Sequence, residues 1–219
     1  AIEKSCDVYF YQLGLKIGLS SLVAGGIKLG ARDKTSIDLP DETRPIFPYA
    51  DVQNYFNRKY GKNGWSQAVV LNLSIGQGEN SQTVVNMARF YTALATDGTA
   101  AKPEIVRDKP ERTQILQLSP DQLSGLRAAL AGVSSNGTAG SARIQGVVLA
   151  GKTGTAQNAQ DPLHHHAWFV GFAPAGDPQI VVAVMIEFGG HGTRAARIAS
   201  KIIQSYLKVE PASFINTDG

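Results

Sequence analysis

The sequence predicts an α+β domain of layered type, in which an antiparallel sheet is flanked by helices. Three observations favour this class. Apolar residues recur at helical spacing in several segments up to residue 133, three apolar strand candidates follow between residues 147 and 188, and an amphipathic helix comes after them. Helices followed by antiparallel strands, instead of alternating strands and helices, indicate α+β and not a parallel sheet.

Two helices are predicted at the start of the chain. The first covers residues 2–17 and stops before Gly18, because four apolar residues recur there at helical spacing: Ile2, Val8, Leu13 and Ile17. A short helix over about 20–29 would end at Gly30, since glycine commonly follows the last helical turn.

The middle of the chain alternates between irregular and helical segments. Residues 38–64 contain Pro, Asn, Gly and aromatic residues without a period, which predicts a long surface excursion. Residues 81–96 predict a strongly amphipathic helix with Ser81 as its cap. Ser119, followed by a proline in the first turn, opens another helix that runs to about Val133.

The last third of the chain predicts the sheet. Residues 147–153, 167–173 and 179–188 are expected to form adjacent antiparallel strands, and the Pro- and Gly-containing loop over 173–178 predicts a hairpin between the last two. A final helix over 193–207 would pack across the sheet. Its predicted apolar face consists of Ile198, Ala199, Ile202, Ile203 and Tyr206.

Composition excludes several classes of protein. Hydrophobic residues make up 43% of the 219 residues, which is enough for a sizeable core and excludes disorder for most of the chain. The net charge is +3 with scattered basic residues, so no nucleic-acid partner is expected. A single cysteine, Cys6, excludes an internal disulfide framework and a Cys-based zinc site. The longest apolar run, Ile180 to Ile186, is too short to span a bilayer.

One segment combines a cation with hydroxyl groups in an extended stretch. In Gly151-Lys152-Thr153-Gly154-Thr155, alternation along a strand would direct Lys152 and Gly154 to one face of the sheet and Thr153 and Thr155 to the other. A sheet edge of this kind can bind a peptide through its backbone, while the hydroxyl groups and the ammonium group recognise the carboxylate of the peptide.

Six motifs occur in a fixed order along the chain: SCDVYFYQLG, TSIDLPDE, LSIGQGE, GKTGTAQ, HAWFVGFAPA and EFGGHG. Lys-Thr-Gly preceded by a Ser-x-Asn/Asp element is the set shared by penicillin-binding proteins and serine β-lactamases. Over residues 1–207 the sequence resembles the transpeptidase domain of a class B penicillin-binding protein, most of all the elongation type, penicillin-binding protein 2. The resemblance implies a serine β-lactamase/transpeptidase-like fold that is incomplete at its N-terminus, with the C-terminal part of the domain over 1–208 and a tail over 209–219.

The family's nucleophile is the serine of a Ser-x-x-Lys motif that precedes the Ser-x-Asn element and uses its lysine as base. No such motif precedes Ser5, and the chain opens without an initiator Met, so we expect a fragment whose nucleophile lies outside it. The one literal match, Ser205 to Lys208, comes after Lys-Thr-Gly, and its lysine groups with Arg194 and Arg197 on a solvated helix face. A catalytic lysine must instead be desolvated to act as a base.

The resemblance implies roles for six residues. Ser5 would relay a proton to the leaving amine. Asp7 occupies the position that is more often Asn, where a carboxylate accepts but cannot donate a hydrogen bond. Lys152 would attract the C-terminal carboxylate of the substrate, which Thr153 and Thr155 would hydrogen-bond, with Gly154 between them. The backbone N–H of Thr155 would supply half of an oxyanion hole.

The implied function is peptidoglycan D,D-transpeptidation for cell-wall cross-linking and cell shape. A serine acyl-enzyme would form on the D-Ala-D-Ala stem peptide and would be blocked by β-lactams. No cofactor and no metal are implied. The expected partners are membrane proteins of cell-wall elongation, and the expected location is the cell envelope, as an extracytoplasmic or periplasmic domain of a protein anchored in the inner membrane.

Other interpretations stay open at this point. A non-catalytic penicillin-binding or sensor module on the same fold is one. Residues 146–153 also match the phosphate-binding-loop pattern G-x-x-x-x-G-K-[ST] of a nucleoside triphosphatase, which requires a helix to start near Lys152. His164-His165-His166 is interpreted as a solvated loop, because no cysteine and no clear carboxylate partner accompanies it. Cys6 is expected to be a buried small side chain, and His191 either a turn residue or a residue that lines the site.

Overall fold

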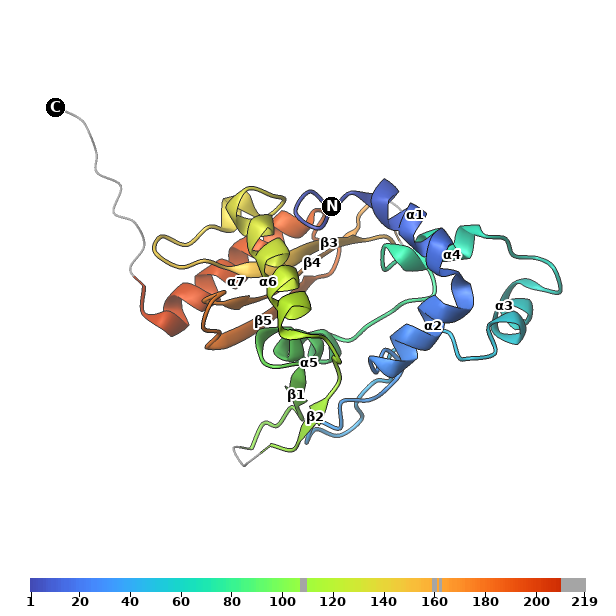
Figure 1. The fold of residues 1–219 in the computed structure, drawn as a ribbon, viewed down its shortest axis with the longest axis horizontal. Helices are drawn as coiled ribbons and strands as arrows, with labels where there is room; N and C mark the ends of the chain where they lie inside the picture. Colours follow the sequence, from blue (N-terminus) through green and yellow to red (C-terminus); the bar gives the residue numbers. More distant parts are fainter. Residues whose placement is uncertain (107–109, 159–160, 162, 210–219) are drawn as a thin grey trace. The chain divides into compact units, whose positions relative to one another are not determined.

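The computed structural model describes residues 1–106, 110–158, 161 and 163–209, and the predicted tail lies outside the described residues from 210 onward (Figure 1). The chain divides into two compact units, Ala1–Leu126 and Arg127–Gly219. The first is mainly helical and the second contains the predicted sheet, so the observed class is α+β as predicted.

The first unit contains helices and a small antiparallel hairpin of β1 with β2. The elements are α1 (Asp7–Ile17), α2 (Leu19–Lys28), α3 (Val52–Tyr60), α4 (Ala68–Ser74), α5 (Val84–Ala95), β1 (Thr99–Ala101) and β2 (Arg112–Gln114). The helix α6 (Pro120–Ser135) begins in this unit and ends in the second.

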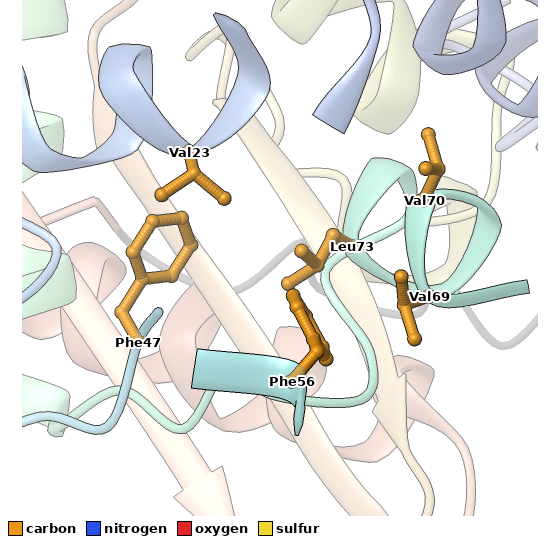
Figure 2. Close-up of a cluster of buried hydrophobic side chains, with 6 residues drawn as sticks. All are labelled: Val23, Phe47, Phe56, Val69, Val70 and Leu73. Carbon is orange, nitrogen blue, oxygen red and sulfur yellow. The ribbon is translucent and has the colours of Figure 1, made fainter. Parts of the chain in front are cut away.

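The core of the first unit joins α2, α3 and α4 (Figure 2). Figure 2 shows Val23 facing Phe47, and Phe56 facing Leu73. Phe56 is fully buried and belongs to α3, so the prediction of an irregular surface excursion over 38–64 is wrong. The reason is length: nine residues with a single fully buried aromatic side chain show no readable period. The Asp51 carboxylate caps this helix by accepting the N–H of Asn54 at 3.1 Å.

The first predicted helix begins later than expected and packs through a different residue. Cys6 N–H donates to the Ala1 carbonyl at 3.1 Å, so the chain makes a turn there and α1 starts at Asp7. Three of its predicted apolar face residues are exposed: Val8, Leu13 and Ile17. Gly14 is buried instead, because any Cβ at this position would overlap the Ser74 hydroxyl of α4. α1 therefore approaches α4 closely at Gly14, and the predicted apolar stripe does not form this contact.

The starts of three further helices can be compared with the start and cap residues predicted for them. The helix over 20–29 is confirmed as α2 within one residue. In α5 the cap is Thr83, whose hydroxyl accepts the N–H of Asn86 at 3.1 Å, while the predicted cap Ser81 forms a backbone bridge with Ile46. In α6 the predicted cap Ser119 is confirmed. It is part of a reciprocal capping box, because its N–H donates to the side chain of Gln122 at 2.9 Å and its hydroxyl accepts the Gln122 N–H at 3.2 Å.

The second unit contains the predicted antiparallel sheet. Its strands lie in the order β3 (Ala150–Ala156), β4 (His166–Ala173) and β5 (Ile180–Ile186), and a short 3-10 helix, η1 (Gly140–Ala142), precedes them. The prediction of adjacent antiparallel strands is confirmed, with shifted ends. Val147 pairs with Ile144 in an isolated bridge, so the first strand starts at Ala150, and the last strand stops two residues early, at Ile186.

The final helix, α7 (Gly192–Leu207), packs across all three strands, as Figure 1 shows. Only two of the five residues predicted for its apolar face are buried. Ala199 and Ile203 are buried, but three predicted members are exposed by 43–59%: Ile198, Ile202 and Tyr206. Ala195, Ala196 and Ser200 are buried in their place. The helix turns its small side chains to the sheet, because these allow the closest backbone approach.

That approach is closest at the start of α7. A Cβ on Gly192 would lie 2.6 Å from the carbonyl oxygen of Gly154 in β3 and 2.8 Å from that of Trp168 in β4. Real Cβ atoms essentially never come this close to backbone, so only glycine allows α7 to start here. The helix start therefore fixes the position of β3 at Gly154.

We predict that Gly192→Ala lowers the free energy of unfolding by about 1–3 kcal/mol, because the added methyl group meets backbone that cannot rotate away. Urea unfolding of the variant protein measures this. Gly176→Ala is the matched control, since no atom of the described residues lies within 4 Å of a Cβ there. Equal unfolding midpoints for the two variants would contradict the close contact.

A buried carboxylate connects α3 to the loop after α4. Glu79 is 3% exposed, accepts a hydrogen bond from the Tyr60 hydroxyl and forms an ion pair with Lys59 at 3.0 Å. Burial raises the pKa of the Glu79 carboxyl, but the hydrogen bonds from Tyr60 and Lys59 outweigh it, and the pKa lies below its ordinary value of 4.5. The charged form of Glu79 therefore stabilises the folded protein.

We predict that Glu79→Gln destabilises the protein at neutral pH, because it removes the charge that pairs with Lys59. The expected loss is only about 1 kcal/mol, since Lys59 is half exposed and water screens the ion pair. Because the folded-state pKa is depressed, the wild-type advantage is complete above pH 4.5 and is lost as the pH falls through the folded-state pKa. Thermal unfolding from pH 7 to pH 3 measures the difference. Glu111→Gln, at an exposed position, is the control. A difference between wild type and Glu79→Gln that stays constant with pH would contradict the prediction.

Candidate active site

The Lys-Thr-Gly segment lies on β3, at the edge of the sheet within the described part of the chain. Lys152 is opposite Val170 of β4, and Gly154 is opposite Trp168. A Cβ on Gly154 would lie 3.1 Å from the Cβ of Trp168, a tighter contact than most side chains accept. The predicted sheet edge with a cation and hydroxyl groups is therefore present, and its geometry is set by β4 on one side and by the start of α7.

The side chains of this segment are partly buried and already engaged. The ammonium group of Lys152 donates to the backbone carbonyl of Thr153 at 3.0 Å. The hydroxyl of Thr153 lies 2.7 Å from the hydroxyl of Thr138, a hydrogen-bond distance. Thr155 is two residues further along the same strand and hence on the same face as Thr153. The strand thus offers an ammonium group and hydroxyl groups of the kind that bind a carboxylate.

Ser5 and Asp7 lie at the entry to α1 and not along it. Ser5 has a φ of +51° and is half-buried, and its N–H donates to the Ile2 carbonyl at 3.2 Å. Asp7 is the first residue of α1 and is exposed. The prediction that Ser5 is on the first helix is therefore wrong, because the turn over residues 1–6 holds it in a left-handed conformation. The resemblance implies that Ser5 and Asp7 lie beside Lys152 and Thr153. Ser5 and Asp7 belong to the first unit and Lys152 to the second, so this stays a prediction.

Two further expectations about single residues are corrected. Cys6 is exposed at the N-cap of α1 and is not a buried filler, because the helix starts one residue after it. The histidine tract does have a carboxylate neighbour: Asp161 lies 2.6 Å from the His164 ring, whose hydrogen bond holds the pKa of Asp161 below its ordinary value. Among the described residues no group of three or more His, Cys, Asp or Glu side chains is placed to hold a metal ion. His191 is exposed and precedes α7.

The phosphate-binding-loop interpretation is wrong. Lys152 lies in the middle of β3, opposite a strand residue of β4, and a helix does not start there. A phosphate-binding loop needs the N-terminus of a helix at this position, where backbone N–H groups converge on the phosphate. The nucleoside triphosphatase alternative is therefore discarded.

The sequence patterns did not predict that Thr138 contributes to this site. Thr138 belongs to the loop between α6 and η1 and reaches the hydroxyl of Thr153 across 15 residues of sequence. Its segment, Asn136 to Gly140, contains small and turn-forming residues that predict a loop and no more. The two hydroxyl groups meet only in the folded chain, where the end of α6 is hydrogen-bonded through Ser134 to Leu149, just before β3.

None of the described helices is both long and apolar enough to cross a bilayer. Among curated proteins, the chain is 31% identical to the peptidoglycan D,D-transpeptidase MrdA of Acinetobacter baumannii, over 94% of this chain and 34% of that protein. Among solved structures, it is similar to the penicillin-binding protein PBP2 of Helicobacter pylori, with a TM-score of 0.82, 30% identity and coverage of 96% of this chain and 40% of that one.

A structure of the complex between PBP2 and MreC from Helicobacter pylori is also similar, with a TM-score of 0.83, 29% identity and coverage of 95% of this chain and 39% of that chain. The chain thus spans well under half the length of these relatives. The family model of the penicillin-binding protein transpeptidase domain matches residues 1–204, which is nearly the whole chain. With Lys-Thr-Gly on an edge strand beneath the start of the final helix, and with this match over almost its full length, the chain belongs to the penicillin-binding protein transpeptidase domain family.

Proposed function

We propose that the protein is a peptidoglycan D,D-transpeptidase of the elongation type, and that residues 1–208 form the C-terminal part of its transpeptidase domain, followed by a tail. The observation that supports this most is the edge strand β3, which carries Lys152, Thr153 and Thr155 in a family whose members include proteins named for this activity. The nucleophilic serine and its lysine would come from the part of the longer protein that precedes Ser5.

The proposed reaction runs in two acyl transfers. The serine hydroxyl adds to the carbonyl carbon of the penultimate D-Ala, its proton passes to the lysine base, and the C–N bond to the terminal D-Ala breaks as that amine takes up a proton. The acyl-enzyme ester is then attacked by the amine of a second stem peptide, which forms the cross-link and returns the proton to the serine oxygen. β-Lactams would be attacked in the same way and would stay attached.

Residues of this chain would bind and orient the substrate. Lys152 attracts the terminal carboxylate, and the hydroxyl groups of Thr153 and Thr155 donate hydrogen bonds to it. The backbone N–H of Thr155 donates to the oxygen on which negative charge develops, with the second donor supplied by the amide of the nucleophilic serine. A Cβ at Gly154 would be tight against Trp168, so glycine at this position lets the strand stay close to its neighbour.

The family resemblance also implies roles for Ser5 and Asp7. Ser5 would relay the proton from the lysine base to the departing amine. Asp7 can only accept hydrogen bonds, so it would accept an amide N–H of the stem peptide, whereas an asparagine could also donate to a carbonyl group. The turn that precedes α1 would present both side chains at one end of that helix.

The partners and the location are part of the same proposal. The similarity to the Helicobacter pylori PBP2 that has been solved with MreC supports a partner from the membrane-bound elongation machinery. A substrate on the outer side of the cytoplasmic membrane requires the domain to be extracytoplasmic, anchored by another part of the protein. No cofactor is needed, since both steps are acyl transfers.

A second candidate function is a non-catalytic penicillin-binding or sensor module on the same fold. One observation favours it: these 219 residues contain no Ser-x-x-Lys motif ahead of Ser5, and that motif carries the nucleophile of the enzyme. Such a module would lack the nucleophilic serine, so it would bind penicillin without being acylated and would not join two stem peptides. Cross-linking of purified lipid-linked peptidoglycan precursor by the full-length protein separates the two functions.

We predict that a fluorescent penicillin acylates the full-length protein but not residues 1–219 alone, because these residues do not contain the family's nucleophile. Intact-mass analysis after incubation measures the adduct. A stable single adduct on Ser5 in the isolated chain would contradict the role proposed for Ser5 and make it the nucleophile.

We also predict that Lys152→Ala in the full-length protein lowers the second-order rate of penicillin acylation about a hundredfold, since it removes a cation that is preorganised toward the carboxylate. Lys201→Ala, on the exposed face of α7, is the matched control and should leave the rate unchanged. Stopped-flow fluorescence measures both rates. Equal rates for the two variants would overturn the assignment of Lys152.

A further inference from the structure

The side chain of Thr138 makes a specific contact with the proposed carboxylate site. Its hydroxyl oxygen lies 2.7 Å from that of Thr153, and the contact is partly buried. We propose that Thr138 is a positioning residue, which orients the Thr153 hydroxyl so that it donates to the carboxylate of a stem peptide or β-lactam. The inference rests on the proposed function, because it names the residue that sets carboxylate recognition at that site.

The loop that carries Thr138 is held in place at both ends. The N–H of Ala139 donates to the Val133 carbonyl at the end of α6, at 2.9 Å, and Ala139 is fully buried. The Ala142 N–H donates to the Ala139 carbonyl at 2.9 Å and closes the 3-10 helix. The Ser134 hydroxyl donates to the Leu149 carbonyl, just before β3 begins. The loop that carries Thr138 is therefore held relative to β3 by these hydrogen bonds, without help from a ligand.

The chemistry of a carboxylate decides the direction of the hydrogen bond. Either hydroxyl can be the donor on geometry alone. A carboxylate only accepts hydrogen bonds, so a Thr153 that binds one must use its single proton for that bond. Thr138 must then donate to Thr153, which leaves the Thr153 proton directed away from Thr138. A chain of two hydroxyl groups also polarises the outer one and strengthens its bond to an anion.

If Thr138 had only a structural role, its substitution would affect the reactions with different ligands in a different pattern. If Thr138 only stabilised the loop, its loss would weaken reactions with all ligands equally. If it orients Thr153, its loss affects ligands that carry a carboxylate and spares those in which the carboxylate is masked. The carboxylate of the ligand is therefore the variable to change in the test.

The experiment uses the full-length protein as wild type, Thr138→Val, Thr138→Ser and Thr92→Val. Valine keeps the shape of threonine without the hydroxyl, and serine keeps the hydroxyl. Thr92, whose hydroxyl donates to the Ala88 carbonyl at 3.0 Å in α5, controls for the loss of a partly buried threonine hydroxyl elsewhere. Each protein is titrated with benzylpenicillin and with its methyl ester, and the half-saturating concentration and the limiting acylation rate are measured separately, together with the unfolding midpoint.

We expect Thr138→Val to raise the half-saturating concentration of benzylpenicillin about tenfold, in line with the loss of one hydrogen bond to a charged group. For the methyl ester the change should stay below about twofold, and Thr138→Ser should restore the wild-type value. Equal losses for acid and ester, or no loss with benzylpenicillin, would overturn the inference while leaving the proposed function intact. A wild-type protein that benzylpenicillin does not acylate would overturn the proposed function and this inference with it.

Discussion

The backbone contact between the start of α7 and β3 is the constraint on which the second unit depends. Gly192 brings the helix against the carbonyl groups of Gly154 and Trp168, at distances that no other residue type permits. Because β3 is an edge strand, pairing with β4 holds it on only one side, and the helix start supplies the second restraint. Backbone contacts on two sides therefore restrict the position of the Lys-Thr-Gly segment.

In the first unit, too, a glycine permits two elements to pack closely. Gly14 lets α1 approach α4 at Ser74, and the α1 residues that are apolar at helical spacing do not form its packing face. The loop after α4 is held by the buried Glu79 and its partners Lys59 and Tyr60. The helix that begins at Asp7 is thus placed by the close approach of Gly14 to Ser74, while the ion pair of Glu79 links α3 to the loop after α4.

Prediction from sequence succeeded where one local signal was strong. The Ser119 cap and the proline after it correctly predicted the start of α6, and two apolar runs joined by a Pro- and Gly-containing loop correctly predicted the pairing of β4 with β5. It failed for α3, where nine residues are too few for a visible period, and for three of the five residues predicted on the packing face of α7. A helix with apolar residues on two sides does not reveal which side the sheet will cover.

The amino-acid sequence by itself determined the fold class, the order of the strands and the residues of the Lys-Thr-Gly segment, because periodicity and motif spacing are local properties of the chain. Tertiary structure alone decided that the hydroxyl groups of Thr138 and Thr153 lie within hydrogen-bond distance and that Gly192 packs against the backbone of Gly154. It also decided that the Glu79 carboxylate is buried and paired with a lysine. These contacts join residues 15 to 38 positions apart in the sequence. Their existence depends on the angle at which whole elements pack, which no local pattern encodes.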